Sequence, residues 1–156
     1  YASLVECDLY HDSRLHVLAW TAADIETKTR ALAMATTTLD SMVEWQGSRK
    51  TATQALAWPR SGTTFDSLFV DDNVIPMPVK RSTCELARLL IAGDLTSDVG
   101  QNDLQSLNLG KGALEIAFKS TAEKKRIPSS IGELLQGLGF FISDKRGTIR
   151  QQNLIR

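Results

Sequence analysis

The sequence has few of the features that would indicate a membrane span, a disulfide framework or a metal centre. No run of about eighteen consecutive apolar residues occurs, so no transmembrane helix is predicted. The first residues also lack the basic segment and apolar run of a secretory leader. Only two cysteines are present, Cys7 and Cys84, and they lie far apart and outside any zinc spacing. We therefore expect both to be reduced, buried side chains in a protein made and kept in the cytoplasm.

Net charge is also absent. Lys and Arg total 18 and so do Asp and Glu, so the whole chain has no electrostatic reason to bind nucleic acid or an anionic membrane. Residues 1–78 nevertheless hold six basic and ten acidic side chains, whereas residues 79–156 hold twelve basic and eight acidic ones. Oppositely charged halves favour head-to-tail contact between copies. An uneven scatter of solvated charges explains the composition equally well.

Glycine and proline are scarce, with ten and four residues, and no low-complexity tract or internal repeat occurs. This excludes fibrous and disordered classes, and 42% apolar with 23% charged residues is typical of a globular protein. A chain of 156 residues is one domain long. It can bury about 68 to 70% of its unfolded surface without help from metal or disulfides.

Apolar residues at helical spacing predict a mainly α fold. The predicted helices cover residues 4–12, 22–43, 77–92 and 130–137. Capping signals precede three of them: Ser3 with Glu6, Thr21 with Asp24, and Ser130. Pro76 and Pro78 fit only the first turn of the helix over 77–92, which Gly93 ends.

The remaining segments follow other patterns. Residues 44–74 are rich in turn signals and predict a long irregular connection, which in a compact domain usually has a function. Residues 104–118 alternate with the period of a strand around Gly110-Lys111-Gly112 and predict a β-hairpin. A hairpin alone is marginal, so we expect it to pack on the helices or to pair with a neighbouring subunit. The predicted architecture is a small helical bundle with a hairpin insertion over residues 1–142, followed by an extended C-terminal tail over 143–156.

No constellation of side chains indicates catalysis, a cofactor or a metal. Cys7 and His11 share a helix face but lack the further ligands of a zinc site. The Gly-Lys-Gly turn lacks the earlier Gly and the following Ser or Thr of a phosphate loop. Asp8 and Asp12 lie one helical turn apart, and such pairs are more often a solvated face than an acid–base pair. No local signature marks a nucleophilic Ser or Cys, so we predict that the protein is not an enzyme.

Binding of nucleic acid has limited support. The cluster Lys124-Lys125-Arg126 and the basic C-terminal tail could contact phosphates. The aromatic residues near them are Phe140 and Phe141, and both can belong to the core rather than stack on bases.

One segment carries a resemblance. Residues 54–62, Gln-Ala-Leu-Ala-Trp-Pro-Arg-Ser-Gly, resemble a recurrent motif of phage neck proteins, which are described either as DnaT-like single-stranded-DNA-binding proteins or as head-to-tail adaptors. Features of the same family follow the same order along residues 1–93. These are Ser3-x-x-Glu6 with Tyr10, Trp45-x-Gly47, Ile75-Pro76 with Val79-Lys80, and Cys84-Glu85-Leu86-Ala87.

The resemblance implies a structural subunit of the virion neck of a tailed bacteriophage, assembled in the cytoplasm of the bacterial host. Such subunits form a homo-oligomeric, typically dodecameric ring beneath the portal protein and link it to tail or nozzle proteins. Genomic DNA passes through the ring without sequence-specific binding. Neither a membrane nor a cofactor is implied. The alternative within the same resemblance is a single-stranded-DNA-binding protein of DnaT-like type.

The resemblance also implies roles for particular residues. The tail alternates aliphatic and basic side chains, which suits docking to a partner with ordering on binding. The residues expected to dock to portal are Arg146, Thr148, Ile149, Arg150, Leu154, Ile155 and Arg156. The residues expected to anchor the irregular connection or a subunit contact are Trp45, Trp58, Pro59 and Arg60, with Arg60 pairing to an acid of the same or a neighbouring subunit. A plain core role for Trp58 remains equally open.

Overall fold

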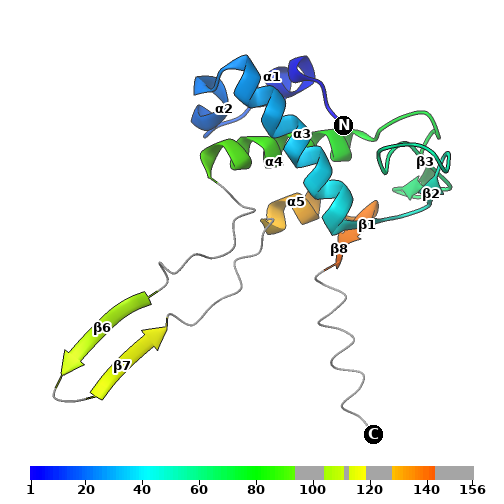
Figure 1. Cartoon of the computed structure of the whole chain (residues 1–156). Coiled ribbons are helices and arrows are strands. Elements are labelled where there is room, and N and C mark those ends of the chain that lie inside the picture. The colour runs from blue at the N-terminus through cyan, green and yellow to red at the C-terminus, as the bar shows by residue number, and fades with distance from the viewer. Residues whose placement is uncertain (94–103, 111–112, 119–127, 143–156) are drawn as a thin grey trace, which may run out of the picture.

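The computed structural model describes residues 1–93, 104–110, 113–118 and 128–142. The helices are α1 (Leu4–Asp12), α2 (Leu18–Ala22), α3 (Ile25–Met42), α4 (Met77–Ala92) and α5 (Ser129–Leu134). The strands are β1 (Val43–Trp45), β2 (Ser48–Arg49), β3 (Arg60–Ser61), β4 (Thr64–Phe65), β5 (Leu68–Phe69), β6 (Leu104–Gly110), β7 (Ala113–Phe118) and β8 (Gly139–Phe141). The predicted fold class, mainly α with a hairpin insertion, is confirmed (Figure 1).

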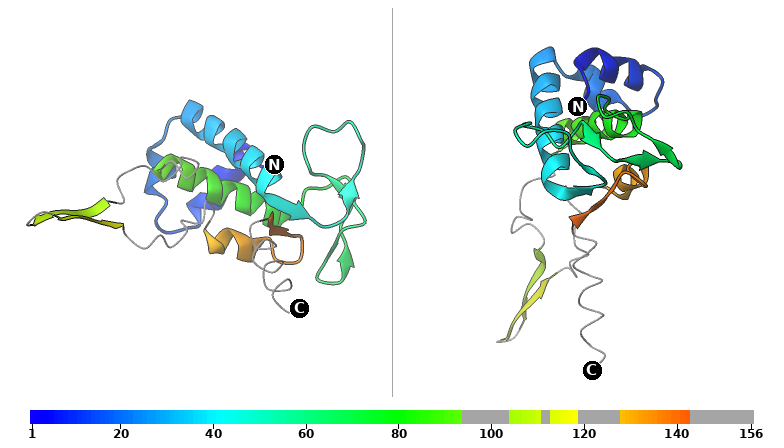
Figure 2. Two further views of the ribbon diagram at one scale, coloured as in Figure 1. Left: turned by 60° about the horizontal axis from the view of Figure 1, so that its bottom comes forward. Right: turned by 90° about the vertical axis from the view of Figure 1, so that its right-hand side faces the viewer.

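The central pair of the fold is α3 with α4. Both helices turn small and aliphatic side chains inward, at the spacing of one helix face. The buried set comprises Ala31, Leu32, Ala35, Leu39, Val79, Leu86 and Ala87. Helices α1 and α2 pack at one end of this pair, while α5 lies on the other side of α4 (Figures 1 and 2). Small side chains at the crossing let the two helices approach closely, as ridge-into-groove packing requires.

The capping box of α1 is confirmed. Ser3 Oγ accepts from the backbone N–H of Glu6 at 3.2 Å, and the Glu6 carboxylate accepts from the backbone N–H of Ser3 at 2.8 Å. The start of the long helix was predicted too early. Residues 18–22 form the separate helix α2, and Asp24 itself caps α3 by accepting from the N–H of Thr27 at 2.7 Å. Asp24 therefore serves as the cap and not as the partner of a cap at Thr21.

The later helices also agree in position and differ in their caps. Helix α4 has the predicted bounds, with Pro78 in its first turn and Gly93 just beyond its end. Helix α5 is shorter than predicted, and Ser130 does not cap it. Pro128 stands at the N-cap instead. A proline fits there because it gives up no N–H that the helix would use.

Strand β1 continues directly from α3 and pairs antiparallel with β8, so residues 43–45 and 139–141 lie side by side. Sequence analysis missed this pairing because its strands are short and distant along the chain. Gly139 makes it possible. A Cβ at Gly139 would lie 2.8 Å from Val43 and 2.9 Å from the carbonyl oxygen of Glu44. The strands could not approach this closely with any larger residue.

The predicted hairpin is confirmed as β6 and β7, antiparallel, with a register shift between Leu104 and Ser106. The ribbon of the hairpin lies apart from the helices (Figures 1 and 2). Pairing with a neighbouring subunit stays a prediction. None of the helices in the described part of the chain is long and apolar enough to cross a membrane.

Candidate interaction surface

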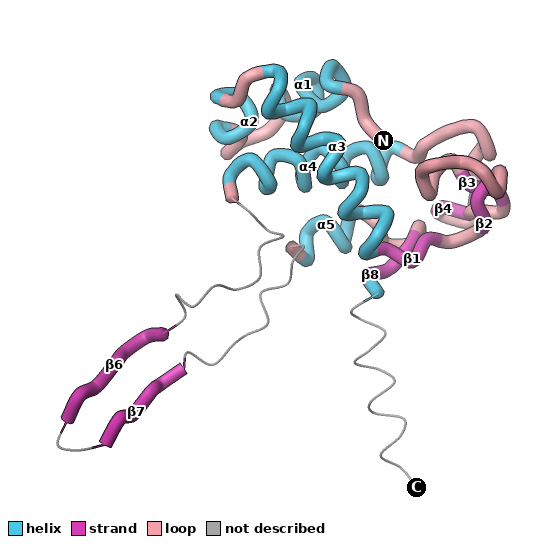
Figure 3. Tube along the Cα trace, viewed as in Figure 1, coloured by secondary structure: helices cyan, strands magenta, loops and turns pink. Residues whose placement is uncertain are grey.

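Residues 46–74, here called the extension, form a lobe beside the end of α3 and the strand pair β1–β8 (Figures 1 and 3). Sequence analysis predicted an irregular connection here, and the structure adds two small antiparallel ladders, β2 with β3 and β4 with β5. Each strand of these ladders has only two residues. Ladders this short need side chains to hold them in place.

Two of the predicted anchors belong to the core at the base of the extension. Trp58 is 2% exposed and meets the ring of Trp45 edge to face, with ring centres 5.6 Å apart. The ring of Tyr1 also meets Trp45 edge to face, with ring centres 6.4 Å apart. Such pairs stabilise by about 0.5–1.5 kcal/mol beyond the area they bury. Trp58 therefore lies in the core, and Pro59 follows it through a cis peptide bond.

Arg60 is the main polar side chain that holds the extension together. Its guanidinium donates to the carbonyl oxygens of Gln46 at 2.7 Å, Gly47 at 2.6 Å and Ala57 at 3.1 Å. Within the subunit, three backbone carbonyls therefore take the place of the expected acid, and pairing of Arg60 with an acid of a neighbouring subunit stays a prediction. A planar guanidinium with several donors can satisfy three carbonyls together. Burial lowers the pKa of Arg60.

Gln46 and Asp40 make further hydrogen bonds that hold the extension in place. The Gln46 side chain accepts from the N–H of Thr64 at 2.9 Å and so ties β4 to β1. Asp40, on α3, accepts from the N–H of Ala57 at 3.0 Å, and burial raises the pKa of its carboxyl. Gly47 has φ +72°, and a Cβ there would lie 2.4 Å from a backbone oxygen. The motifs Trp-x-Gly (residues 45–47) and Trp-Pro-Arg (residues 58–60) thus contribute to one set of contacts, which holds the extension on the body.

The ladder of β4 and β5 presents apolar side chains to solvent. Asp66 and Ser67 form its two-residue turn with positive φ, the conformation that suits a tight hairpin. Phe65 packs back toward the body, because a Cβ on Gly137 would lie 3.8 Å from its ring. Leu68 is 73% exposed and Phe69 is 86% exposed. We call Leu68, Phe69 and this turn the apolar tip. Sequence analysis did not predict this exposed apolar site, because the alternation of apolar and polar side chains here is only a few residues long.

Acidic side chains lie in the turn of the apolar tip and just after it. Residues 61–79 contain three Asp and no Lys or Arg. Asp66, Asp71 and Asp72 are all exposed. Asp71 accepts from the N–H of Asn73 at 2.7 Å, which lowers its pKa, and Asp72 accepts from Ser61 Oγ at 2.9 Å. These bonds stiffen the chain that follows the tip and leave its negative charge facing solvent.

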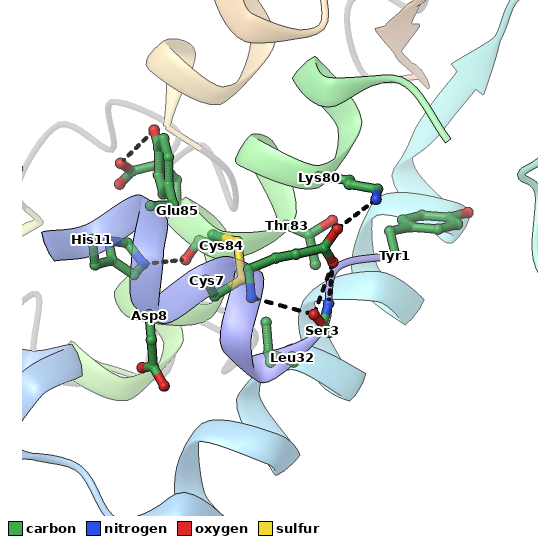
Figure 4. The surroundings of a disulfide bond; sticks show 12 residues. Tyr1, Ser3, Cys7, Asp8, His11, Leu32, Lys80, Thr83, Cys84 and Glu85 are labelled. Atoms are coloured by element: carbon green, nitrogen blue, oxygen red, sulfur yellow. Dashed lines mark hydrogen bonds and ion pairs between the residues drawn. A yellow bond between two sulfur atoms is a disulfide. The ribbon is translucent and has the colours of Figure 1, made fainter. Parts of the chain in front are cut away.

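At the other end of the molecule, α1 is joined to α4 (Figure 4). Cys7 and Cys84 form a disulfide with their Cα atoms 5.3 Å apart, so the expectation of two reduced thiols was wrong. Nothing in the sequence spacing indicates this bond, since 77 positions separate the cysteines and only helix packing brings them together. Both residues are buried.

A polar cluster surrounds this disulfide. Glu85 is only 6% exposed and accepts from Tyr10 Oη at 3.1 Å, from Arg14 at 2.6 Å and from Arg88 at 3.0 Å. Nearby, His11 Nε2 lies 3.2 Å from the carbonyl oxygen of Cys84, and burial lowers the pKa of the imidazole. A buried carboxylate is tolerated only when it is paired in this way. The cluster therefore has a structural explanation.

No catalytic or metal-binding arrangement emerges from the described residues. Cys7 is used in the disulfide and His11 contacts a carbonyl, so the pair weighed as partial zinc ligands does not form a site. In residues 1–93 and the other described ranges, no group of three or more His, Cys, Asp or Glu could hold a metal ion. Asp8 is not simply a solvated acid. It accepts from Trp20 Nε1 at 2.8 Å and from Lys28 at 2.9 Å.

The remaining predicted site residues lie outside the described residues. This holds for the portal-docking set, Arg146, Thr148, Ile149, Arg150, Leu154, Ile155 and Arg156, and for the cluster Lys124-Lys125-Arg126. The two aromatic residues weighed for base stacking are described. Phe141 packs against the core and Phe140 is exposed.

Comparison with known proteins gives one match. The model of the family described as "Putative DnaT-like ssDNA binding protein" covers residues 1–156. The chain belongs to this family. No curated protein and no solved structure matches the chain.

Proposed function

We propose that this member of the family is a structural head-to-tail adaptor of a tailed bacteriophage. It acts as one subunit of a ring beneath the portal protein, links portal to tail or nozzle proteins in the virion neck, and catalyses nothing. The observation that carries the proposal is the apolar tip. A short hairpin that exposes Leu68 and Phe69 suits protein docking, because large exposed apolar groups mark interaction sites.

Charge and aromatic placement support a protein partner over nucleic acid. Residues 1–93 and 128–142 together hold twelve acidic and nine basic side chains. The helical body with its extension is therefore net negative by three, and the duplex in a neck channel would not be held tightly by it. Trp20, Trp45 and Trp58 are all buried, so none of them is available to stack on bases.

The order of motifs in the resemblance also supports an assembly role. Trp45, Trp58 and Arg60 hold the extension against the body, as described above. A subunit of a ring needs such a rigid lobe, since each copy must present the same surface to its neighbours. We propose that the copies form a dodecamer through which genomic DNA passes, and that residues 143–156 dock to portal.

Binding of single-stranded DNA is the second candidate, and the family description favours it. Residues 94–127 and 143–156 hold nine basic and six acidic side chains, so the positive charge of the chain is concentrated there. Phosphate contacts from such segments would make binding strongly dependent on salt.

One experiment separates the two candidates. The mass of the purified full chain would be measured by analytical ultracentrifugation, alone, with portal protein of the same phage, and with an oligonucleotide of single-stranded DNA. A ring that forms with portal, together with weak binding of the oligonucleotide, is the expected result. A monomer that ignores portal and binds the oligonucleotide tightly, with loss of binding at high salt, would overturn the adaptor proposal.

A matched pair of variants tests the docking segment. Replacing Arg146, Arg150 and Arg156 with Gln should weaken association with portal, because the tail would lose its charged contacts. The control replaces Lys124, Lys125 and Arg126 with Gln and removes the same number of charges elsewhere. Equal association of both variants with portal would contradict docking through the tail.

A further inference from the structure

The apolar tip has a free edge as well as exposed side chains. The sheet that carries it has the order β4–β5, and Gln46 already accepts from the N–H of Thr64 on the outer edge of β4, so the edge left open among the described residues is that of β5. The ladder is prolonged by a bond from the N–H of Val70 to the carbonyl oxygen of Thr63 at 3.0 Å. An unpaired edge with apolar side chains is a template for an added strand.

The C-terminal tail has the complementary chemistry. Residues 143–156 hold four Lys or Arg and one acid, Asp144, whereas residues 61–79 hold three Asp and no cation. The tail also carries the aliphatic side chains of Ile149, Leu154 and Ile155. Opposite charges around apolar groups give both attraction and a preferred orientation.

The tail also begins within reach of the apolar tip. It leaves the body just after Ile142, which follows β8. The turn before β8 lies against the hairpin, because a Cβ on Gly137 would lie 3.8 Å from the Phe65 ring. A segment of fourteen residues (143–156) spans about 46 Å when extended. A tether this short holds the segment at an effective concentration on the order of millimolar.

We propose that in the free protein residues 143–156 bind to the apolar tip of the same molecule. The segment adds to the open edge of the β4–β5 ladder, its aliphatic side chains cover Leu68 and Phe69, and its cations face Asp66, Asp71 and Asp72. This goes beyond the proposed function, because it concerns the protein before any partner is bound. A partner that takes the tail would also uncover the apolar tip.

The test is amide hydrogen exchange of the full chain, without portal or DNA. The tail-neutral variant replaces Lys145, Arg146, Arg150 and Arg156 with Gln. Amides of residues 65–70 should exchange about tenfold faster in this variant than in the wild type, because local opening becomes easier. Raising the salt concentration should have the same effect on the wild type. The control variant, with Gln at Lys124, Lys125 and Arg126, should match the wild type.

A second variant changes the apolar tip and not the tail, and so tests whether the effect arises only from the altered charges. Phe69→Ser should speed exchange in residues 149–155 about tenfold, since the tail would lose its apolar contact. Unchanged exchange at both places would overturn the proposal. Protection that grows with protein concentration, together with a rise in mass, would also overturn it, because the tail of a second copy would then be the occupant. Neither outcome depends on whether the protein binds portal.

Discussion

The helical end of the molecule and the extension are held together in different ways. Around α1 and α4, a disulfide, a paired buried carboxylate and close helix packing act together. The extension has ladders of two residues each and depends on a few side chains, chiefly Trp58, Arg60 and Gln46. A region that buries little of its own apolar surface can present the rest to a partner. The contrast suggests that the helical end supplies stability and the extension supplies recognition.

The largest loss of stability is expected from a substitution of Trp58, which lies where the extension meets the helical body. Trp58→Ala should lower the free energy of unfolding by about 3–5 kcal/mol, because a buried ring is replaced by a cavity. Urea unfolding followed by circular dichroism measures this change. Phe69→Ala, at the exposed apolar tip, should change it by less than about 0.5 kcal/mol. Equal losses in the two variants would mean that the tip is also part of the core.

The disulfide tests the helical end. Replacing Cys7 and Cys84 together with Ala should cost about 2–4 kcal/mol, since the bond closes a long loop and restricts the unfolded chain. Thermal and urea unfolding would measure the loss, and mass spectrometry after alkylation in denaturant would count the thiols. Two free thiols in the oxidised wild-type protein would contradict the bond itself.

A substitution of Arg60 tests whether hydrogen-bond geometry or charge holds the extension in place. Arg60→Lys keeps the charge but loses the planar fork, so it should lower the free energy of unfolding by about 1–2 kcal/mol and speed amide exchange in residues 46–61. Arg49→Lys, on the adjacent strand β2, is the control and should change neither quantity. If the two variants behave alike, charge and not hydrogen-bond geometry holds the extension.

The smallest effect expected concerns the ion pair between α1 and α4. Glu6 pairs with Lys80 at 2.6 Å and bonds to Ser3, which lowers its pKa from 4.5 to about 2. A depressed pKa in the folded state adds stability that is present above the unfolded value. The contribution is lost as pH falls from 4.5 toward 2. Because Glu6 is partly exposed, it should amount to less than about 1 kcal/mol.

Urea midpoints measured across this pH range would test the sign. The difference in stability between wild type and Glu6→Gln should shrink as the pH is lowered, because the wild-type carboxyl then becomes neutral as well. A constant difference would mean that Glu6 acts through packing alone.

Local patterns predicted the helices well and their caps less well. The bounds of α1 and α4 agree with the predictions, since a capping box and two prolines mark those starts unambiguously. The start of α3 was misplaced because Thr21 and Asp24 both look like caps, and only the turn after α2 decides between them. The interaction surface was predicted only as an irregular segment with a function. Its apolar tip depends on which side of a very short ladder faces the body.

What the sequence determined by itself was therefore local: the helix faces, the β6–β7 hairpin, the absence of a membrane-spanning helix among the described residues, and the family to which the chain belongs. Tertiary structure alone decided the bond of Cys7 to Cys84, the pairing of β1 with β8, and the carbonyl partners of Arg60. The physical reason is range. A cap or an apolar period is set by neighbours along the chain, whereas these contacts join residues that meet only when the helices and strands pack together.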